Sequence, residues 1–174
     1  LSRDLAAIEP PVWSGLIATF LRQHSCSVAI LDAEAEGLNH QQTAERIAVI
    51  APRLTVFVIY GQQPSASTQC MPAGRKVCDI LNTLADIPTL VMGTHPSALP
   101  KRTLLEEPYT YVCQGEGPST ILGLVIALRA PQHSLREVPG LWYMEKGEPV
   151  GNAPAQLLTN LDRELPGQAW DLLD

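Results

Sequence analysis

The sequence predicts a doubly wound α/β domain built around a five-stranded parallel sheet. Between Leu5 and Arg129, short apolar runs alternate with longer stretches of helical period, which is typical of successive βαβ units. The apolar runs are rich in Val, Ile, Leu and Tyr and lack polar alternation, as expected of strands covered by helices on both faces. These two observations favour a Rossmann-like or flavodoxin-like sheet with strand order 2-1-3-4-5.

The five strands correspond to five apolar runs, taken in chain order. They read LAAI, SVAIL, TVFVIY, TLVM and YTYVC, at residues 5–8, 27–31, 55–60, 89–92 and 109–113. The stretches that follow them have helical period and predict helices at residues 15–24, 41–50, 73–85, 99–107 and 119–130. The fourth of these helices is expected to be short.

The pattern changes after Pro131. The stretch EVPGLWYMEKGEPVGN predicts two short strands around Lys146 and Gly147, a β-hairpin that follows the last helix. The final stretch, APAQLLTNLDRELPGQAWDLLD, contains prolines and no clean amphipathic period, so we expect a linker there. The chain therefore divides into an α/β domain at 1–131, a hairpin extension at 132–152 and a linker at 153–174.

Composition argues against several classes of partner. The net charge is -6 and the twelve Lys and Arg residues are scattered, so we expect neither nucleic acid nor an anionic membrane as a partner. The four cysteines form no CxxC pair and have no zinc-site spacing, so they predict reduced thiols rather than disulfides or a metal site. With no membrane-spanning stretch and no signal-peptide pattern, a cytoplasmic protein is expected. A chain that starts at Leu1 and stops at Asp174 is also expected to be part of a longer protein.

Open parallel sheets bind ligands beyond the carboxyl ends of their strands. This rule selects five loops, at residues 9–15, 32–38, 61–68, 93–98 and 114–118. The third loop, YGQQPSAST, offers uncharged hydrogen-bonding groups, which suit a large neutral ligand or an aromatic base better than a triphosphate. No GxGxxG opens the first helix and no GxxxxGKS/T occurs in the chain, so dinucleotide and P-loop sites lack their main support.

The fourth and fifth loops, GTHPSALP and QGEGPST, combine three glycines with polar side chains. Glycine lets the backbone pass close to a bulky ligand, although a single glycine also occurs simply to start a tight turn. His95 has no second histidine or cysteine at useful spacing, so contact with a bound molecule or a capping role is favoured over metal binding. The loop LDAEAEG is interpreted as a solvated acidic turn rather than a ribose site, because the glycine fingerprint is missing.

A series of stretches resembles the cobalamin-binding domain at the N-terminus of cobalamin-dependent radical S-adenosylmethionine enzymes. In chain order they are EPPVWSGLIATFLR, VAILDAEAEGL, GTHPSALPKRTLLEE, YVCQGEGPST, VPGLWYMEKGEPVGN and LPGQAWDLL. The resemblance covers almost the whole chain and depends on the series rather than on any single motif. It implies a cobalamin cofactor, and it implies that this chain is the cofactor domain of a methyltransferase.

The resemblance also implies a second domain. In such enzymes a linker like LDRELPGQAWDLL leads into a radical S-adenosylmethionine barrel, whose CxxxCxxC motif holds a 4Fe-4S cluster. No CxxxCxxC occurs in residues 1–174, so this portion is not expected to be catalytic alone. The implied partners are the chain's own C-terminal radical S-adenosylmethionine domain and a small-molecule or peptide substrate.

The first loop departs from the DxHxxG motif of other cobalamin domains, in which the histidine coordinates cobalt from below. If Gly15 is matched to the motif's glycine, Val12 stands at the histidine position and Pro10 at the aspartate position. The resemblance therefore implies cobalamin bound base-off without a histidine lower ligand, with Val12 or Trp13 against the corrin. The alternative for Trp13 is an ordinary core residue at the start of a helix.

The detached dimethylbenzimidazole tail is expected between the third and fourth strands, near Ser65 and Ser67 on one side and Gly93 and Thr94 on the other. Two other functions remain open: a stand-alone cobalamin carrier or sensor, and a flavodoxin-like nucleotide-binding module. The complete set of residues expected to bind the cofactor is Pro10, Pro11, Val12, Trp13, Gly15, Gln63, Ser65, Ser67, Gly93, Thr94, His95, Pro96, Gly115, Glu116 and Gly117.

Overall fold

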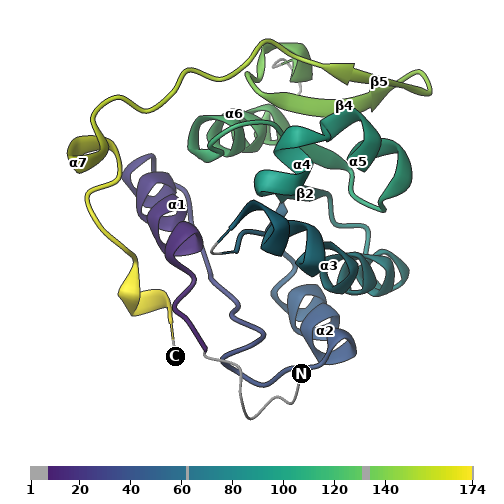
Figure 1. Ribbon diagram of the computed structural model, residues 1–174, viewed down its shortest axis with the longest axis vertical. Coiled ribbons are helices and arrows are strands. Elements are labelled where there is room, and N and C mark those ends of the chain that lie inside the picture. The colour runs from purple at the N-terminus through teal and green to yellow at the C-terminus, as the bar shows by residue number, and fades with distance from the viewer. Residues whose placement is uncertain (1–7, 62, 131–133, 174) are drawn as a thin grey trace.

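A computed structural model describes residues 8–61, 63–130 and 134–173. Its sheet has five strands in the order β1-β2-β3-β4-β5, and the pair β4 and β5 lies at one end of the molecule (Figure 1). The first three strands are parallel and the last two are antiparallel, so the α/β class is confirmed but the sheet is mixed rather than wholly parallel. The strands are β1 (Thr55–Val58), β2 (Thr89–Met92), β3 (Tyr111–Cys113), β4 (Leu141–Glu145) and β5 (Glu148–Gly151).

Among the described residues, neither of the first two predicted strands forms part of this sheet. Residues 5–7 of the first lie outside the described residues, and Ile8 has no regular secondary structure. The prediction of a strand at 27–31 is wrong for the part of the chain that the structure describes. In the predicted order this segment pairs only with residues 5–8, so it has no ladder partner among the described residues. Its side chains nevertheless pack on the core, with Val28 and Leu31 each against a cluster of buried residues.

The predicted hairpin joins the sheet of the α/β domain. Strand β4 pairs with β3, placing Tyr143 opposite Tyr111, and β5 pairs with β4. The turn residues Lys146 and Gly147 both have positive φ, of 54° and 87°, as a two-residue hairpin turn requires. The hairpin is therefore continuous with the parallel strands.

Several helices differ from the predicted ones in length. The helix predicted at 73–85 is longer because it continues through Pro72, where the buried side chains of Met71 and Cys78 hold it on the core. The short helix predicted at 99–107 corresponds to Pro100–Glu106, and a further short helix, Thr94–Ala98, lies in the stretch predicted as a loop. None of the described helices is long and apolar enough to cross a membrane. The helices are α1 (Val12–Gln23), α2 (His40–Ile50), α3 (Pro64–Leu84), α4 (Thr94–Ala98), α5 (Pro100–Glu106), α6 (Pro118–Arg129) and α7 (Leu161–Glu164).

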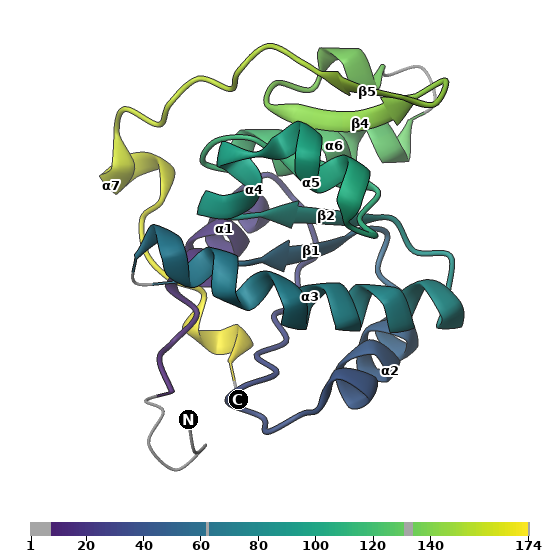
Figure 2. The same ribbon diagram turned by 45° about the vertical axis from the view of Figure 1, so that its right-hand side comes forward.

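The helices cover both faces of the sheet (Figure 2). Alternate side chains of β2 enter different clusters: Leu90 and Met92 pack with residues of α1 and α6, and Val91 packs with residues of α3 and α5. This alternation is the period of a strand buried on both sides. Helix α2 packs mainly on α3, and Phe57 of β1 packs against the cluster that the two helices form.

The segment predicted as a linker folds back along the domain, and residues 153–173 are called the C-terminal strap below. The strap begins where Gly140 N donates to Ala153 O (2.7 Å) and returns to α1, where Ala169 N donates to Gly15 O (3.2 Å). Arg22 of α1 pairs with Asp171 at 2.8 Å. Figure 1 shows the strap passing beside α1.

Candidate functional site

An aromatic pair marks the carboxyl end of β1. The chain enters α1 through Pro10 and Pro11, and Val12 N donates to Pro10 O (2.8 Å). This start presents Trp13 to Tyr60, whose ring centroid lies 4.9 Å away with 23° between the ring planes. Trp13 remains 42% exposed, so the pair offers apolar surface to a ligand. Sequence reasoning missed Tyr60, which it counted as the end of a strand, although its place directly before Gly61 at the carboxyl end was a usable signal.

Tyr60 is a neutral phenol at physiological pH. Burial, with smaller contributions from the neighbouring Cys113 and Glu116, raises the pKa of Tyr60 to about 12. Burial likewise raises the pKa of the Cys113 thiol to about 11, against a smaller lowering by its hydrogen bond with Thr120. The floor of this end of the sheet is therefore uncharged.

The ends of β1 and β2 are held together by Ser67 and Gly93. The Ser67 side chain is fully buried, donates to Ile59 O (2.5 Å) and accepts from His95 N (3.1 Å). Gly93 has φ 143°, and a Cβ there would lie 1.9 Å from Ile59 O. Only glycine lets the backbone at residue 93 lie this close to Ile59 O. Ser67 and Gly93 therefore keep the carboxyl ends of β1 and β2 packed together.

Two more hydrogen bonds join the loops after β1, β2 and β3 into a continuous rim. Thr68 Oγ1 and His95 Nδ1 are 2.9 Å apart, and Gly115 N donates to Ser97 Oγ at 2.9 Å. Gly115 has φ 102°, and no atom lies within 4 Å of the place its Cβ would take. The rim therefore has open space above Gly115.

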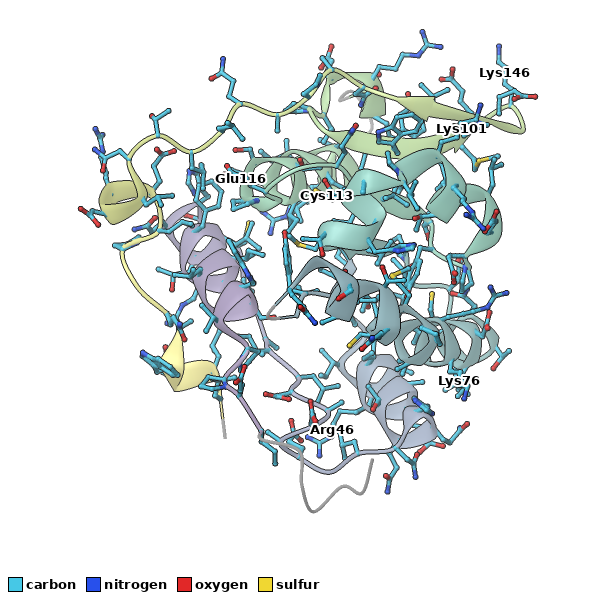
Figure 3. The ribbon with its side chains drawn as sticks, in the orientation of Figure 1. Arg46, Lys76, Lys101, Cys113, Glu116 and Lys146 are labelled. Carbon is cyan, nitrogen blue, oxygen red and sulfur yellow. The ribbon has the colours of Figure 1, made fainter. Side chains whose placement is uncertain are left out.

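The end of β3 contacts the strap. Glu116 is half-buried, and its carboxylate accepts a hydrogen bond from Leu158 N at 2.8 Å. Glu116 is labelled in Figure 3, at the start of α6. Gly117 beside it has φ 101°, and a Cβ there would meet the Met92 side chain at 2.4 Å. Within the GEG sequence, Gly117 therefore packs closely on Met92, and Glu116 holds the strap.

The acidic loop at 32–38 takes no part in the rim. Asp32 Oδ1 accepts from Ala35 N (3.1 Å), and Glu36 pairs with Arg46 of α2 at 3.0 Å. These contacts are those of a local turn packed against the following helix. The sequence predicted a solvated acidic turn that leads into a helix; of its carboxylates, Glu34 is exposed whereas Asp32 and Glu36 are half-buried.

The predicted site residues divide by exposure. Six are exposed and four half-buried, and these can contact a ligand: Pro10, Val12, Trp13, Gln63, Ser65 and Gly115, then Pro11, Thr94, His95 and Glu116. Five are buried and shape the site from below: Gly15, Ser67, Gly93, Pro96 and Gly117. The described residues include no group of three or more His, Cys, Asp or Glu side chains placed to hold a metal ion.

Solved structures similar to this one include two radical enzymes. The radical S-adenosylmethionine methyltransferase TsrM from Kitasatospora setae, with cobalamin and a 4Fe-4S cluster bound, is 18% identical over 89% of this chain, with a TM-score of 0.68. The cobalamin-dependent S-adenosylmethionine radical enzyme OxsB, with aqua-cobalamin bound, is 21% identical over 98% of this chain, with a TM-score of 0.74. This chain spans only 28% and 23% of those two chains.

No curated protein sequence gives a significant match. A family of known domains does, because the sequence model for the B12 binding domain matches residues 2–125. The matched part includes the first loop, the rim and most of α6. Since it covers most of the 174 residues, the chain belongs to the B12-binding domain family.

Proposed function

We propose that this domain binds cobalamin base-off and without a histidine lower ligand. The observation that carries the proposal is the Trp13–Tyr60 pair at the start of α1, next to Val12, which the match to DxHxxG puts at the histidine position. Val12 and Trp13 are 44% and 42% exposed, and neither side chain can coordinate cobalt. Partly exposed apolar side chains of this size suit the flat face of a corrin, whose burial against them contributes about 1.5–3 kcal/mol each.

The rim fits the rest of such a ligand. Corrin carries amide side arms, and the rim offers neutral donors and acceptors in Thr68 and Ser97 together with open space above Gly115. For the dimethylbenzimidazole tail, the exposed Ser65 and half-buried Thr94 are the better candidates of the predicted set. Ser67 and Gly93 would then form the floor beneath the tail, since both are buried.

We further propose that the domain serves a radical S-adenosylmethionine methyltransferase. Cobalamin, when bound, supplies the methyl donor, and this chain's residues bind it, orient it and keep water from its lower face. The 4Fe-4S cluster and S-adenosylmethionine would be held by a radical domain outside residues 1–174, which contain no CxxxCxxC. The likeness to TsrM and OxsB supports this role, and the acceptor would be a small molecule or a peptide.

A spectroscopic titration tests the cofactor and its lower face separately. Hydroxocobalamin added to the purified chain should bind stoichiometrically and give base-off absorption bands. After reduction to cobalt(II), electron paramagnetic resonance should lack the triplet splitting that an axial nitrogen produces. No binding would overturn the cobalamin proposal, whereas binding with nitrogen splitting would overturn only the lower-face part. A flavin or nucleotide that binds in place of cobalamin would support the flavodoxin-like alternative.

A further inference from the structure

Glu116 holds the C-terminal strap rather than pointing freely toward a ligand. Its carboxylate accepts a hydrogen bond from the backbone N–H of Leu158 at 2.8 Å, across a long separation in sequence. The carboxylate belongs to the loop directly after β3, at the carboxyl edge of the sheet. A negatively charged acceptor on a backbone N–H makes one of the stronger kinds of hydrogen bond.

The strap is attached at a second place, next to the other side of the site. Ala169 N donates to Gly15 O at 3.2 Å, and the Cβ of Gln168 lies 3.2 Å from the position that a Cβ on Gly15 would occupy. Gly15 is two residues from Trp13 on α1. Leu165, between the two attachments, packs against the core cluster that contains Ile17.

These attachments place the strap along the ligand side of the domain. Figure 2 shows the strap running down the side of the molecule to which the β1 and β2 arrows point. One attachment adjoins the loop after β3 and the other adjoins the start of α1, so the strap spans the two ends of the candidate site. Local hydrogen bonds keep this span folded, with Glu164 accepting from Asn160 N at 2.9 Å.

We propose that Glu116 is a positioning residue that fastens the strap as an outer wall of the cobalamin site. The wall rests on the proposed function, because it requires a ligand at the carboxyl edge. The hydrogen bond from Leu158 N to Glu116 does not rest on the proposed function, because it forms in the protein without ligand. Glu116 therefore acts on the ligand through the strap, whereas the sequence predicted a direct cofactor contact.

The fastening is tested in the chain without cobalamin. In Glu116→Ala, amide exchange at Leu158 and tryptic cleavage after Arg163 should both become about tenfold faster, as expected from loss of a charge-assisted hydrogen bond. Glu116→Gln keeps a side-chain oxygen acceptor and should lie between wild type and Glu116→Ala. Glu34→Ala, at an exposed glutamate in the turn before α2, is the matched control and should leave both rates unchanged. Unchanged rates in Glu116→Ala, with the fold intact by circular dichroism, would overturn the inference.

The wall is tested by adding hydroxocobalamin. In the wild-type chain the ligand should slow cleavage after Arg163 several-fold, and in Glu116→Ala this protection should be lost. If cobalamin binds but leaves cleavage after Arg163 unchanged in the wild type, the strap is no wall of the site. If cobalamin does not bind at all, the proposed function fails while the exchange result still decides the role of Glu116.

Discussion

The indole of Trp13 lies over the phenol of Tyr60, with 4.9 Å between the ring centroids and 23° between the ring planes. This contact joins the first turn of α1 to the second residue after the end of β1. Offset stacks of this kind contribute about 0.5–1.5 kcal/mol beyond their buried area. The stack therefore fixes where α1 begins relative to the sheet, and with it the surface offered to a ligand.

Replacing Trp13 with histidine should change the coordination of bound cobalt. If Trp13 lies beneath the corrin, Trp13→His brings an imidazole nitrogen to the open lower position, and the bound cobalamin should shift toward a six-coordinate spectrum. The cobalt(II) form should gain a triplet splitting in electron paramagnetic resonance. Val49, an exposed apolar residue of α2 outside the site, supplies the control, and Val49→His should leave the spectrum unchanged. A wild-type spectrum in Trp13→His would place Trp13 away from the cobalt.

The two serines of the third loop should respond differently to alanine. Ser67 is buried between Ile59 O and His95 N, so Ser67→Ala leaves two groups without their partner and should lower the free energy of unfolding by about 2 kcal/mol. Ser65 is exposed, so Ser65→Ala should keep the stability and weaken cobalamin binding if this serine contacts the tail. Urea unfolding and cobalamin titration of both variants measure the two effects. Equal stability of the two variants would contradict the structural role of Ser67.

The parallel strands and the rim were predictable because they follow local rules. Apolar runs identified β1, β2 and β3, and the carboxyl-edge rule selected the loops that hold His95 and Gly115. The contacts between residues far apart in the sequence could not be predicted. Trp13 with Tyr60 and Glu116 with Leu158 depend on tertiary packing.

One helix boundary was wrong, and the packing of one segment was missed, because local rules do not register tertiary contacts. A proline inside a helical pattern predicts an interruption, but packing against the core carries α3 through Pro72. Prolines and a poor amphipathic period predicted a linker after residue 152. Individual anchors such as Arg22 with Asp171 hold that segment to the domain, and they leave no periodic signal.

Gly93 should tolerate substitution much less well than a glycine in an open turn. A Cβ at Gly93 would overlap Ile59 O at 1.9 Å, and φ of 143° is unfavourable for any other residue. Gly93→Ala should therefore cost about 3 kcal/mol or more, or prevent folding. Gly147 has φ 87° but no atom within 4 Å of its Cβ position, so Gly147→Ala should cost only about 1 kcal/mol. Urea unfolding of the two variants compares the costs, and similar values would show that β1 and β2 can separate at this edge.

Stability should fall in alkaline solution partly because of Tyr60. Burial raises its pKa from 10.0 to about 12, so the folded chain keeps a proton that the unfolded chain releases. The stabilisation is complete below pH 10 and is lost as the pH rises from 10 to 12. Tyr60→Phe keeps a ring for the Trp13 stack but has no hydroxyl to ionise, so its free energy of unfolding should fall less steeply over this range. Urea unfolding of both proteins measures the difference, with neutral pH as the internal control because Tyr60 is protonated there in both states. The same slope in both proteins above pH 10 would mean that Tyr60 ionises as freely in the folded chain as in the unfolded one, and hence that its hydroxyl is open to solvent beside the Trp13 ring.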